Sequence, residues 1–246
     1  MKSLRTFLAL AILLTSQPLA NATSPVPLQE QLEEEIKLSK IKYNDTNYNV
    51  IKIPKNRLIN EDLEIKIAHS VGERKSLESL SSGAIAAING NFYDENDKPI
   101  GYLKDSKVIN GEHINRKNKG FFVVNKGLPD IIRTLGDYHY DVILESYPLL
   151  VYDYGAMRRI NNESDFRSAV AIDKSHNLYL VTTENGTLSA GRITYKEFQD
   201  FLISQNYKTA LNLDGGTSTQ MLKRPGFNQH GLKGIVTAIG IYPSRL

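Results

Sequence analysis

The sequence predicts an α+β fold: a single domain with a mixed β-sheet core and few packed helices. Segments with strand character outnumber helical ones along the 246-residue chain. Residues 63–67 alternate apolar and charged side chains, which is the period-two pattern of a strand with one buried face. Residues 84–88 are entirely apolar and too short for a helix, which indicates a central strand buried on both faces. Only one strand–helix–strand unit stands out, which favours α+β over an all-parallel α/β sheet.

Short-range signals predict the remaining elements. Thr194 and Glu197 have the spacing of a capping box, so a helix is expected from Thr194 onward. A polar turn at residues 173–177 joins two apolar runs, which predicts a hairpin. Pro148 has no N–H and excludes standard interior-strand geometry for residues 144–152. The other expected elements are a helix over 28–40, strands over 48–53, 209–213 and 234–242, a strand pair over 120–124 and 130–133, and a long hairpin or mobile loop before Gly120.

The first 22 residues have the pattern of a secretory signal peptide. Lys2 and Arg5 form a basic head, residues 7–14 are an unbroken apolar run, and Ala20-Asn21-Ala22 supplies a small-x-small cleavage pattern. The apolar run is shorter than the roughly 20 residues that a membrane-spanning helix needs. We therefore expect cleavage before Thr23 and an exported protein, periplasmic or secreted, without stable membrane insertion. An uncleaved anchor is the alternative.

The expected organisation is a signal peptide at residues 1–22, a leader and helix at 23–40, and one domain at 41–246. The net charge of +3 falls to about +1 when Lys2 and Arg5 are removed. No basic field dominates such a chain, which argues against nucleic acid as a partner. The sequence has no Cys, so disulfides cannot brace an exported fold and its core must stabilise it.

Three stretches combine the end of an expected buried strand with polar side chains or glycine. They are residues 89–93, residues 165–169 and residues 214–219. Ends of neighbouring strands meet in space, and ligand sites in sheet proteins gather there. We therefore expect these three stretches to form one site.

The third stretch, residues 214–219, places two adjacent glycines directly after an acidic residue. Glycine allows positive φ, so successive N–H groups can turn outward and form an anion-sized concavity. The hydroxyls of Thr217, Ser218 and Thr219 would add donors to it. A polar hairpin turn, in which Asp214 bonds its own backbone, is the alternative.

In the second stretch, Arg167 stands at the mouth of an apolar strand. Its planar guanidinium matches the oxygens of a phosphate bidentately, which predicts an anion-binding role. A weak surface ion pair with a nearby carboxylate such as Asp165 is the alternative.

No cofactor is expected from the sequence. The five histidines are scattered without the spacing of a zinc site. A divalent metal held by Asp214 and a phosphate oxygen is the alternative. Neither a Gly-x-Ser-x-Gly elbow nor a Walker-type loop occurs, which argues against serine hydrolases and nucleotide hydrolases.

Three motifs, taken in order, resemble the phosphodiester glycosidase family. They are Asn-Gly-x-Phe-Tyr after an apolar strand, Arg-Ser-Ala-Val before a hairpin, and Leu-Asp-Gly-Gly-x-Ser after a capped helix. The resemblance covers roughly residues 84–242 and implies hydrolysis of a sugar 1-phosphodiester at the anomeric carbon, with release of a free sugar and a phosphomonoester. Thr217 and Ala171 stand where the family usually has glycine. The side chain of Thr217 narrows the loop, which bears on the substrate more than on the reaction.

Within this resemblance, Arg167 and the loop at 215–219 would bind the phosphate, because stabilising its charge is the larger demand when a phosphomonoester leaves. Asp214 would act as nucleophile, as base for water or as oxocarbenium stabiliser, with Glu184 as a second carboxylate. The amides of Asn89 and Asn91 would hold sugar hydroxyls or an acetamido group. The candidate catalytic residues are Asp214, Arg167 and Glu184, and the candidate substrate-binding residues are Asn89, Gly90, Asn91, Tyr93, Ser168, Gly215, Gly216, Thr217, Ser218 and Thr219.

The expected partner is a carbohydrate or phosphoglycan substrate. Two alternatives to an enzyme are a non-catalytic module that binds phosphorylated glycans and a protein of exopolysaccharide assembly. An enzyme and a binding module both need the anion site, but only the enzyme needs Asp214.

Overall fold

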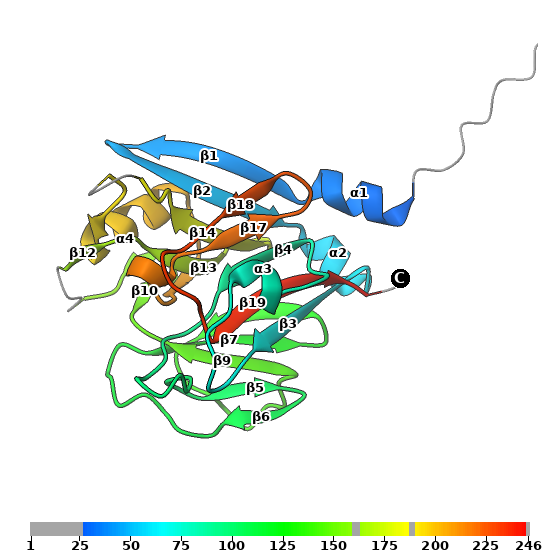
Figure 1. The fold of residues 1–246 in the computed structure, drawn as a ribbon, viewed down its shortest axis with the longest axis horizontal. Helices are drawn as coiled ribbons and strands as arrows, with labels where there is room; N and C mark the ends of the chain where they lie inside the picture. The colour runs from blue at the N-terminus through cyan, green and yellow to red at the C-terminus, as the bar shows by residue number, and fades with distance from the viewer. Residues whose placement is uncertain (1–26, 159–162, 187–189, 245–246) are drawn as a thin grey trace, which may run out of the picture.

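A computed structural model of the protein describes residues 27–158, 163–186 and 190–244. The predicted signal peptide at residues 1–22 and the start of the predicted leader, residues 23–26, lie outside these ranges. The described chain forms a single α+β domain in which strands dominate, as the sequence predicts (Figure 1). Within it, no helix has the length and apolar character needed to cross a membrane.

Three sheets and one short strand pair build the domain. In Figure 1 the β1–β2 hairpin lies at one end and the β5–β6 hairpin at the other, with β3, β4 and β19 between them. The seven-stranded sheet has the order β1 (Lys37–Tyr43), β2 (Thr46–Ile53), β14 (Leu178–Thr183), β13 (Ser168–Ile172), β16 (Thr209–Asn212), β10 (Leu149–Tyr152), β11 (Gly155–Ala156). One five-stranded sheet has the order β18 (Phe227–Gln229), β17 (Met221–Lys223), β4 (Ala86–Asn89), β19 (Thr237–Pro243), β3 (Leu63–His69). The other has the order β6 (Lys107–Asn110), β5 (Leu103–Asp105), β9 (Val142–Ser146), β7 (Gly120–Asn125), β8 (Leu128–Ile132), and the short pair is β12 (Ser164–Asp165) with β15 (Ile193–Thr194).

The described helices are short and lie outside the sheets: α1 (Leu28–Glu35), α2 (Lys55–Ile59), α3 (Leu77–Leu80), α4 (Tyr195–Ser204) and the 3₁₀ turn η1 (Gly216–Ser218). The predicted capping box of α4 is confirmed. The Thr194 hydroxyl accepts from the Glu197 N–H at 3.2 Å, and the Glu197 carboxylate accepts from the Thr194 N–H at 2.8 Å. These bonds satisfy donors that the first turn of a helix otherwise leaves unpaired.

Strand pairing differs from the predicted mixed sheet, because every pairing between described strands is antiparallel. The strand–helix–strand unit explains the difference. Its strands β14 and β16 run in the same direction, but β13 lies between them and pairs antiparallel with both. The helix α4 therefore crosses over one strand instead of joining two paired parallel strands.

Apolar side chains from all three sheets share one core. Ile51 of β2, Ile88 of β4 and Phe122 of β7 are fully buried in the same cluster. On the other face of the seven-stranded sheet, Tyr48 stacks on Phe201 of α4 with ring centroids 3.6 Å apart. Burying side chains of this size stabilises a fold by about 1.5–3 kcal/mol each. The strands β13 and β16, which adjoin two of the polar stretches, are thus held between two apolar layers.

One sequence prediction needs correction at an element boundary, and the hairpin and the interruption predicted further along the chain are confirmed. The helix predicted over 28–40 ends at Glu35, because Ile36 is buried in the core and β1 pairs with β2 from Lys37 onward. The long segment before Gly120 contains the β5–β6 hairpin. The interruption expected at Pro148 is confirmed, since β9 and β10 lie on either side of it in different sheets.

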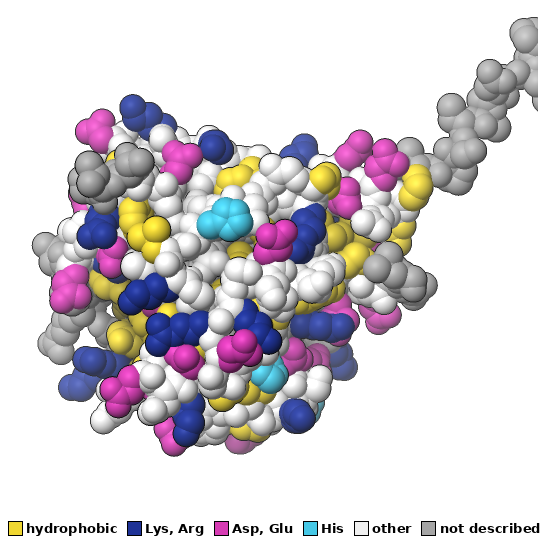
Figure 2. All heavy atoms as spheres, viewed as in Figure 1, with side chains coloured by type: hydrophobic (Ala, Val, Ile, Leu, Met, Phe, Trp, Pro, Cys, Tyr) yellow, Lys and Arg dark blue, Asp and Glu magenta, His cyan; other side chains and the backbone are white. Residues whose placement is uncertain are grey.

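The surface carries charges of both signs. Figure 2 shows Lys and Arg side chains interspersed with Asp and Glu on the face that it views, without a continuous field of either sign. That face therefore offers no extended charged surface to a polyanion or a polycation.

Candidate active site

The side chain of Asn89 joins the three polar stretches at the end of β4. Its Nδ2 donates to the Asp214 carbonyl at 2.7 Å, and its Oδ1 accepts from the Ser168 hydroxyl at 2.8 Å and from the Gln220 N–H at 3.1 Å. Asn89 is fully buried, so each of these bonds replaces water that the amide lost on folding. The structure therefore brings together the three stretches that the sequence placed at strand ends.

Main-chain contacts reinforce this junction. The Asp214 N–H donates to the Gly90 carbonyl at 3.0 Å, and the Leu213 N–H donates to the Ser168 carbonyl at 2.8 Å. A Cβ at Gly215 would lie 2.6 Å from the Phe166 carbonyl oxygen, so only glycine fits between the second and third stretches, and a Cβ at Gly90 would lie 2.4 Å from Oγ1 of Thr237 on β19. The stretches thus approach one another more closely than ordinary side chains allow.

A pocket of about 420 Å³ opens where the stretches meet. Four of the predicted site residues contribute to its wall: Arg167, Asp214, Gly215 and Gly216. The full lining consists of Phe92, Glu163, Ser164, Asp165, Arg167, Tyr195, Asp214, Gly215 and Gly216. Its size and its mixture of aromatic and charged side chains suit a small polar ligand.

The fold raises the pKa of the Asp214 carboxylate. Burial raises its pKa from the ordinary 3.8 to about 6, although hydrogen bonds from the Ser218 hydroxyl and the Gly215 N–H oppose the rise. The nearby negative charge of Asp165 adds to the rise. A carboxylic acid with a pKa near 6 exchanges its proton close to neutral pH, as general acids and bases require.

Arg167 supplies a buried positive charge beside this carboxylate. Its side chain is only 4% exposed, and its guanidinium carbon lies 3.6 Å from the ring centroid of Tyr195. Nε donates to the Ile193 carbonyl at 3.1 Å and Nη2 donates to the Glu163 carbonyl. Burial lowers its pKa, but an arginine side chain stays charged in proteins.

Negative charge from Asp165 and Glu163 acts on Arg167 and opposes the lowering of its pKa by burial. Among the described residues, no carboxylate oxygen lies within ion-pair distance of its guanidinium. The surface ion pair with Asp165 is therefore not formed; the Asp165 carboxylate instead lies 3.8 Å from Nε of Arg192. Nε and Nη2 already donate to carbonyl oxygens, so this pair of nitrogens cannot bind a phosphate bidentately. The third nitrogen, Nη1, is the one that approaches Gly215.

Asp165 is a second carboxylate of the pocket, which sequence reasoning treated only as an ion-pair partner. Its side chain is 42% exposed and packs on Gly216, where a Cβ would lie 2.6 Å from its Oδ2. Gly216 also has a φ of +59°, a conformation that L side chains rarely adopt. The Gly215-Gly216 pair thus lets the chain turn while leaving room for Asp165.

The glycine stretch is a compact turn rather than a concavity of free N–H groups. The Gly216 N–H donates to the Phe166 carbonyl at 2.9 Å, and the Ser218 and Thr219 N–H groups close the 3₁₀ turn onto Gly215 and Gly216 at 3.1 and 3.2 Å. The predicted anion nest is therefore not formed by these donors. This stretch contributes Asp214 and the two glycines, Gly215 and Gly216, to the pocket wall.

Several predicted substrate-binding residues are occupied by contacts within the protein. The Asn91 amide donates to the Ile100 carbonyl at 2.9 Å and accepts from the Thr237 hydroxyl at 2.8 Å, and its side chain is 2% exposed. Asn89 is similarly committed, as described above. Both amides thus position the motifs, and the structure leaves them no free face for a sugar hydroxyl.

The predicted binding residues that carry hydroxyl groups make contacts within the protein or are buried. Tyr93 donates to the Gly234 carbonyl at 3.1 Å and lies 3.3 Å from the Ser218 hydroxyl, which bonds Asp214. The Thr217 carbonyl accepts from Leu232 and Lys233 N–H groups at 2.9 and 3.0 Å. Thr219 is fully buried and, in the described part of the chain, its hydroxyl has no hydrogen-bond partner.

Glu184 does not reach the pocket. At the end of β14 its carboxylate accepts from Nζ of Lys40 at 3.1 Å and from Nδ2 of Asn47 at 3.0 Å, and these contacts lower its pKa. Both partners belong to the β1–β2 hairpin region, on the far side of β14 from β13. Asp165, in contrast, lines the pocket.

Sequence reasoning also missed Tyr195 and Glu163 as pocket residues. Tyr195 is the first residue of the capped helix α4, and its ring supports Arg167. Its position directly after the N-cap was the available signal, because a helix start is a frequent edge of a ligand site. No group of three or more His, Cys, Asp or Glu with the geometry of a metal site occurs among the described residues.

Comparison with known proteins gives structural neighbours at low sequence identity. The chain is similar to the catalytic domain of zebrafish N-acetylglucosamine-1-phosphodiester alpha-N-acetylglucosaminidase, auto-inhibited by its pro-peptide, with a TM-score of 0.62, 16% identity, and coverage of 85% of this chain and 82% of that one. It is similar to a hypothetical protein from Synechocystis with a TM-score of 0.59, 14% identity, and coverage of 84% and 61%. A protein from Burkholderia pseudomallei whose description calls it exported gives a TM-score of 0.50, 10% identity, and coverage of 80% and 74%. These likenesses show the fold.

Sequence comparison adds the family. No curated protein sequence matches the chain significantly. A family model does match it, over residues 82–242, which include all three motifs and every residue of the pocket wall. The match therefore spans well over half of the chain, and the protein belongs to the phosphodiester glycosidase family.

Proposed function

We propose that this protein hydrolyses the glycosidic bond of a sugar 1-phosphodiester and releases the free sugar and a phosphomonoester. One observation carries the proposal: a buried arginine that pairs with no carboxylate among the described residues shares a pocket with an aspartic acid whose pKa is about 6. The first group suits the phosphate and the second suits proton transfer or attack at the sugar. Membership of the family supports a carbohydrate-type substrate.

The residues divide the chemistry between them. The Arg167 guanidinium attracts the phosphate oxygens and stabilises the charge that grows on them as the C1–O bond breaks. Above pH 6 Asp214 is ionised and acts at the anomeric carbon, as nucleophile, as base for water or as stabiliser of the oxocarbenium ion. Asp165 is the second carboxylate of the pair that glycosidases use.

The position of the sugar follows from the same pocket. A phosphate at Nη1 of Arg167 lies against Gly215, so the sugar occupies the space beside Asp214. We further propose that the protein acts outside the cytoplasm after residues 1–22 are removed, which the signal-peptide pattern supports.

The decisive experiment is turnover of a panel of sugar 1-phosphodiesters by the mature chain. The panel contains both anomers of N-acetylglucosamine and glucose 1-phosphate methyl diesters, because the zebrafish neighbour is named for the first sugar. We expect release of sugar and methyl phosphate from at least one substrate. Asp214→Asn and Asp165→Asn should each lower kcat by about 10²–10⁴, whereas Glu184→Gln should retain wild-type kcat.

Full activity of Asp214→Asn would overturn the proposal, and so would equal losses in Asp165→Asn and Glu184→Gln. Binding of the diesters without turnover would favour the non-catalytic module instead. A chelator is included in one arm: loss of activity that added Mg²⁺ restores would assign a metal to Asp214. The kcat/KM of the wild type should fall as pH drops below about 6, because Asp214 then gains a proton.

A further inference from the structure

An aromatic stack extends from the pocket wall toward solvent. Phe92 lines the pocket, and its ring stacks on that of Tyr147 with centroids 4.7 Å apart and an angle of 27° between the planes. Tyr147 also lies near Tyr195 of the pocket: burial raises the pKa of Tyr195, and the charge of Tyr147 is among the smaller causes. The half-exposed ring of Tyr147 therefore continues the wall outward.

The guanidinium of Arg116 lies over the ring of Tyr147 in this stack. The guanidinium carbon of Arg116 lies 5.5 Å from the ring centroid of Tyr147, within cation–π range. Arg116 is exposed, and among the described residues no carboxylate forms an ion pair with it. Its charge is thus available to a ligand that reaches the rim of the pocket.

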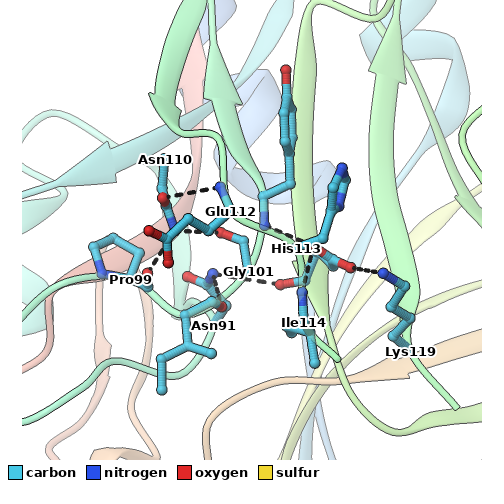
Figure 3. A network of polar contacts seen from close by, with 11 residues as sticks. Asn91, Pro99, Gly101, Asn110, Glu112, His113, Ile114 and Lys119 are labelled. Atoms are coloured by element: carbon cyan, nitrogen blue, oxygen red, sulfur yellow. Dashed lines mark hydrogen bonds and ion pairs between the residues drawn. The ribbon is translucent and has the colours of Figure 1, made fainter. Parts of the chain in front are cut away.

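The backbone that carries Arg116 is fixed at both sides. Ile114 and Lys119, both labelled in Figure 3, contact the fully buried Glu145 carboxylate, which accepts from the Ile114 N–H at 3.2 Å and lies 2.8 Å from Nζ of Lys119. The Asn118 carbonyl accepts from the Leu149 N–H at 2.7 Å, two residues after Tyr147. Arg116 therefore sits on a preorganised segment, and a ligand need not order that segment on binding.

We propose that Phe92, Tyr147 and Arg116 form a second subsite at the pocket rim, which binds an anionic group carried by the alcohol of the phosphodiester. The inference rests on the proposed function and names its substrate class. Arg167 holds the phosphate inside the pocket, so the alcohol esterified to that phosphate points outward toward the rim. The substrate is then a phosphodiester whose alcohol carries a further phosphate or carboxylate.

The test compares three diesters of the preferred sugar 1-phosphate that differ only in their alcohol: methanol, 2-phosphoethanol and 3-hydroxypropanoate. We expect the KM of the wild type to be about fivefold lower for a charged alcohol than for methanol, as an exposed charge-assisted contact predicts. The effect should fall with added salt and lie in KM rather than kcat, because the subsite is remote from C1. A preference for the 2-phosphoethanol diester alone would show that the subsite selects a second phosphate, and a preference for both charged diesters would show that it accepts a phosphate or a carboxylate.

Matched variants isolate the subsite. Arg116→Ala should raise the KM of the charged diesters to that of the methyl diester, and Arg116→Lys should keep part of the preference. Arg133→Ala removes a similar contact elsewhere, with its guanidinium carbon 5.6 Å from the ring centroid of Tyr152, and should change nothing. Equal KM values for all three diesters in the wild type, or equal effects of Arg116→Ala and Arg133→Ala, would overturn the inference.

Failure of the proposed function gives a different result. If no diester is cleaved, calorimetric binding of the same three compounds to Asp214→Asn protein decides the inference. A tighter interaction with the charged diesters, lost in the Arg116→Ala double variant, would support the subsite without hydrolysis. Binding that is equal for all three compounds would contradict it.

Discussion

At the scale of single residues, Asp214 is under opposing demands. Burial favours its neutral form and raises its pKa to about 6, yet the hydrogen bonds from Ser218 and Gly215 favour the carboxylate. A residue that merely closed a turn would gain stability from those bonds. Asp214 instead keeps a charge near neutral pH at a cost to the fold, which is typical of functional groups.

This cost predicts the effect of Asp214→Asn on stability. The pKa of Asp214 in the folded protein lies above the ordinary 3.8. Protonated Asp214 therefore contributes its full stabilisation to the fold below pH 4, and this stabilisation is lost as the pH rises through about 6. Asparagine resembles the neutral acid at every pH. We therefore expect Asp214→Asn to raise the free energy of unfolding by up to about 3 kcal/mol at pH 8 and by almost nothing at pH 4, measured by urea unfolding.

A control of opposite sign is available in Glu184. Contacts with Lys40 and Asn47 lower its pKa, so its small contribution is present at neutral pH and is lost on acidification. Its carboxylate is 37% exposed, so Glu184→Gln should change stability by less than about 1 kcal/mol. Destabilisation of Asp214→Asn at pH 8 would show that the turn needs the carboxylate.

At the scale of elements, the site depends on how the ends of β4, β13 and β16 are tied together. Asn89 at the end of β4 bonds residues of the other two stretches, and a Cβ at Gly90 has no room. The motifs therefore act first as structural junctions. They place Asp214 and Arg167 on one pocket wall, although their own amides and hydroxyls are turned inward.

Asn89→Ala should therefore destabilise the protein strongly. It leaves the Ser168 hydroxyl, the Gln220 N–H and the Asp214 carbonyl without their partner inside the protein. We expect a loss of about 2–4 kcal/mol in the free energy of unfolding, because unsatisfied buried polar groups cost about 1–3 kcal/mol each and relax in part. Chemical unfolding at pH 7 measures it.

The matched control is Asn228→Ala, which removes an exposed amide bonded to Glu78 at 3.3 Å. That variant should stay within about 0.5 kcal/mol of the wild type. Equal stability of the two variants would contradict the junction role of Asn89.

At the scale of the whole molecule, Glu145 connects the outer sheet to the site. Burial alone raises its pKa, but Lys119, the Tyr102 and Ile114 N–H groups and His113 outweigh burial and lower it from the ordinary 4.5. The Asn91 amide also donates to the Glu145 carbonyl at 3.4 Å. The carboxylate thus fixes the segment that carries Arg116, and its backbone contacts the first motif (Figure 3).

This network predicts an acid-sensitive contribution to folding. Because the folded pKa of Glu145 is lowered, its stabilisation is present above about pH 4.5 and is lost as pH falls through the folded value. Glu145→Gln should therefore cost about 2 kcal/mol at pH 7 and less at acid pH. Urea unfolding at pH 7 and pH 3.5 measures the difference, with the exposed Glu112→Gln as control. A cost that does not change with pH would contradict the ionised network.

Much of the fold could be predicted because its signals are local. The all-apolar run before Asn89 specifies a central strand, and the spacing of Thr194 and Glu197 specifies the start of α4. The helix predicted over 28–40 ended early, because the burial of Ile36 and the pairing of β1 are tertiary contacts. The antiparallel pairing likewise depends on β13, a strand that is distant in sequence from β16.

The sequence by itself determined which residues meet: the order of three motifs at strand ends identified the family and selected Asp214 and Arg167. Tertiary structure decided which of the candidate side chains line the pocket. Glu184 and Asp165 are both acidic residues at strand ends, but Glu184 lies against the β1–β2 hairpin while Asp165 lines the pocket. The physical reason is that successive side chains of a strand point to opposite faces, and only the packed neighbours show which face holds the ligand.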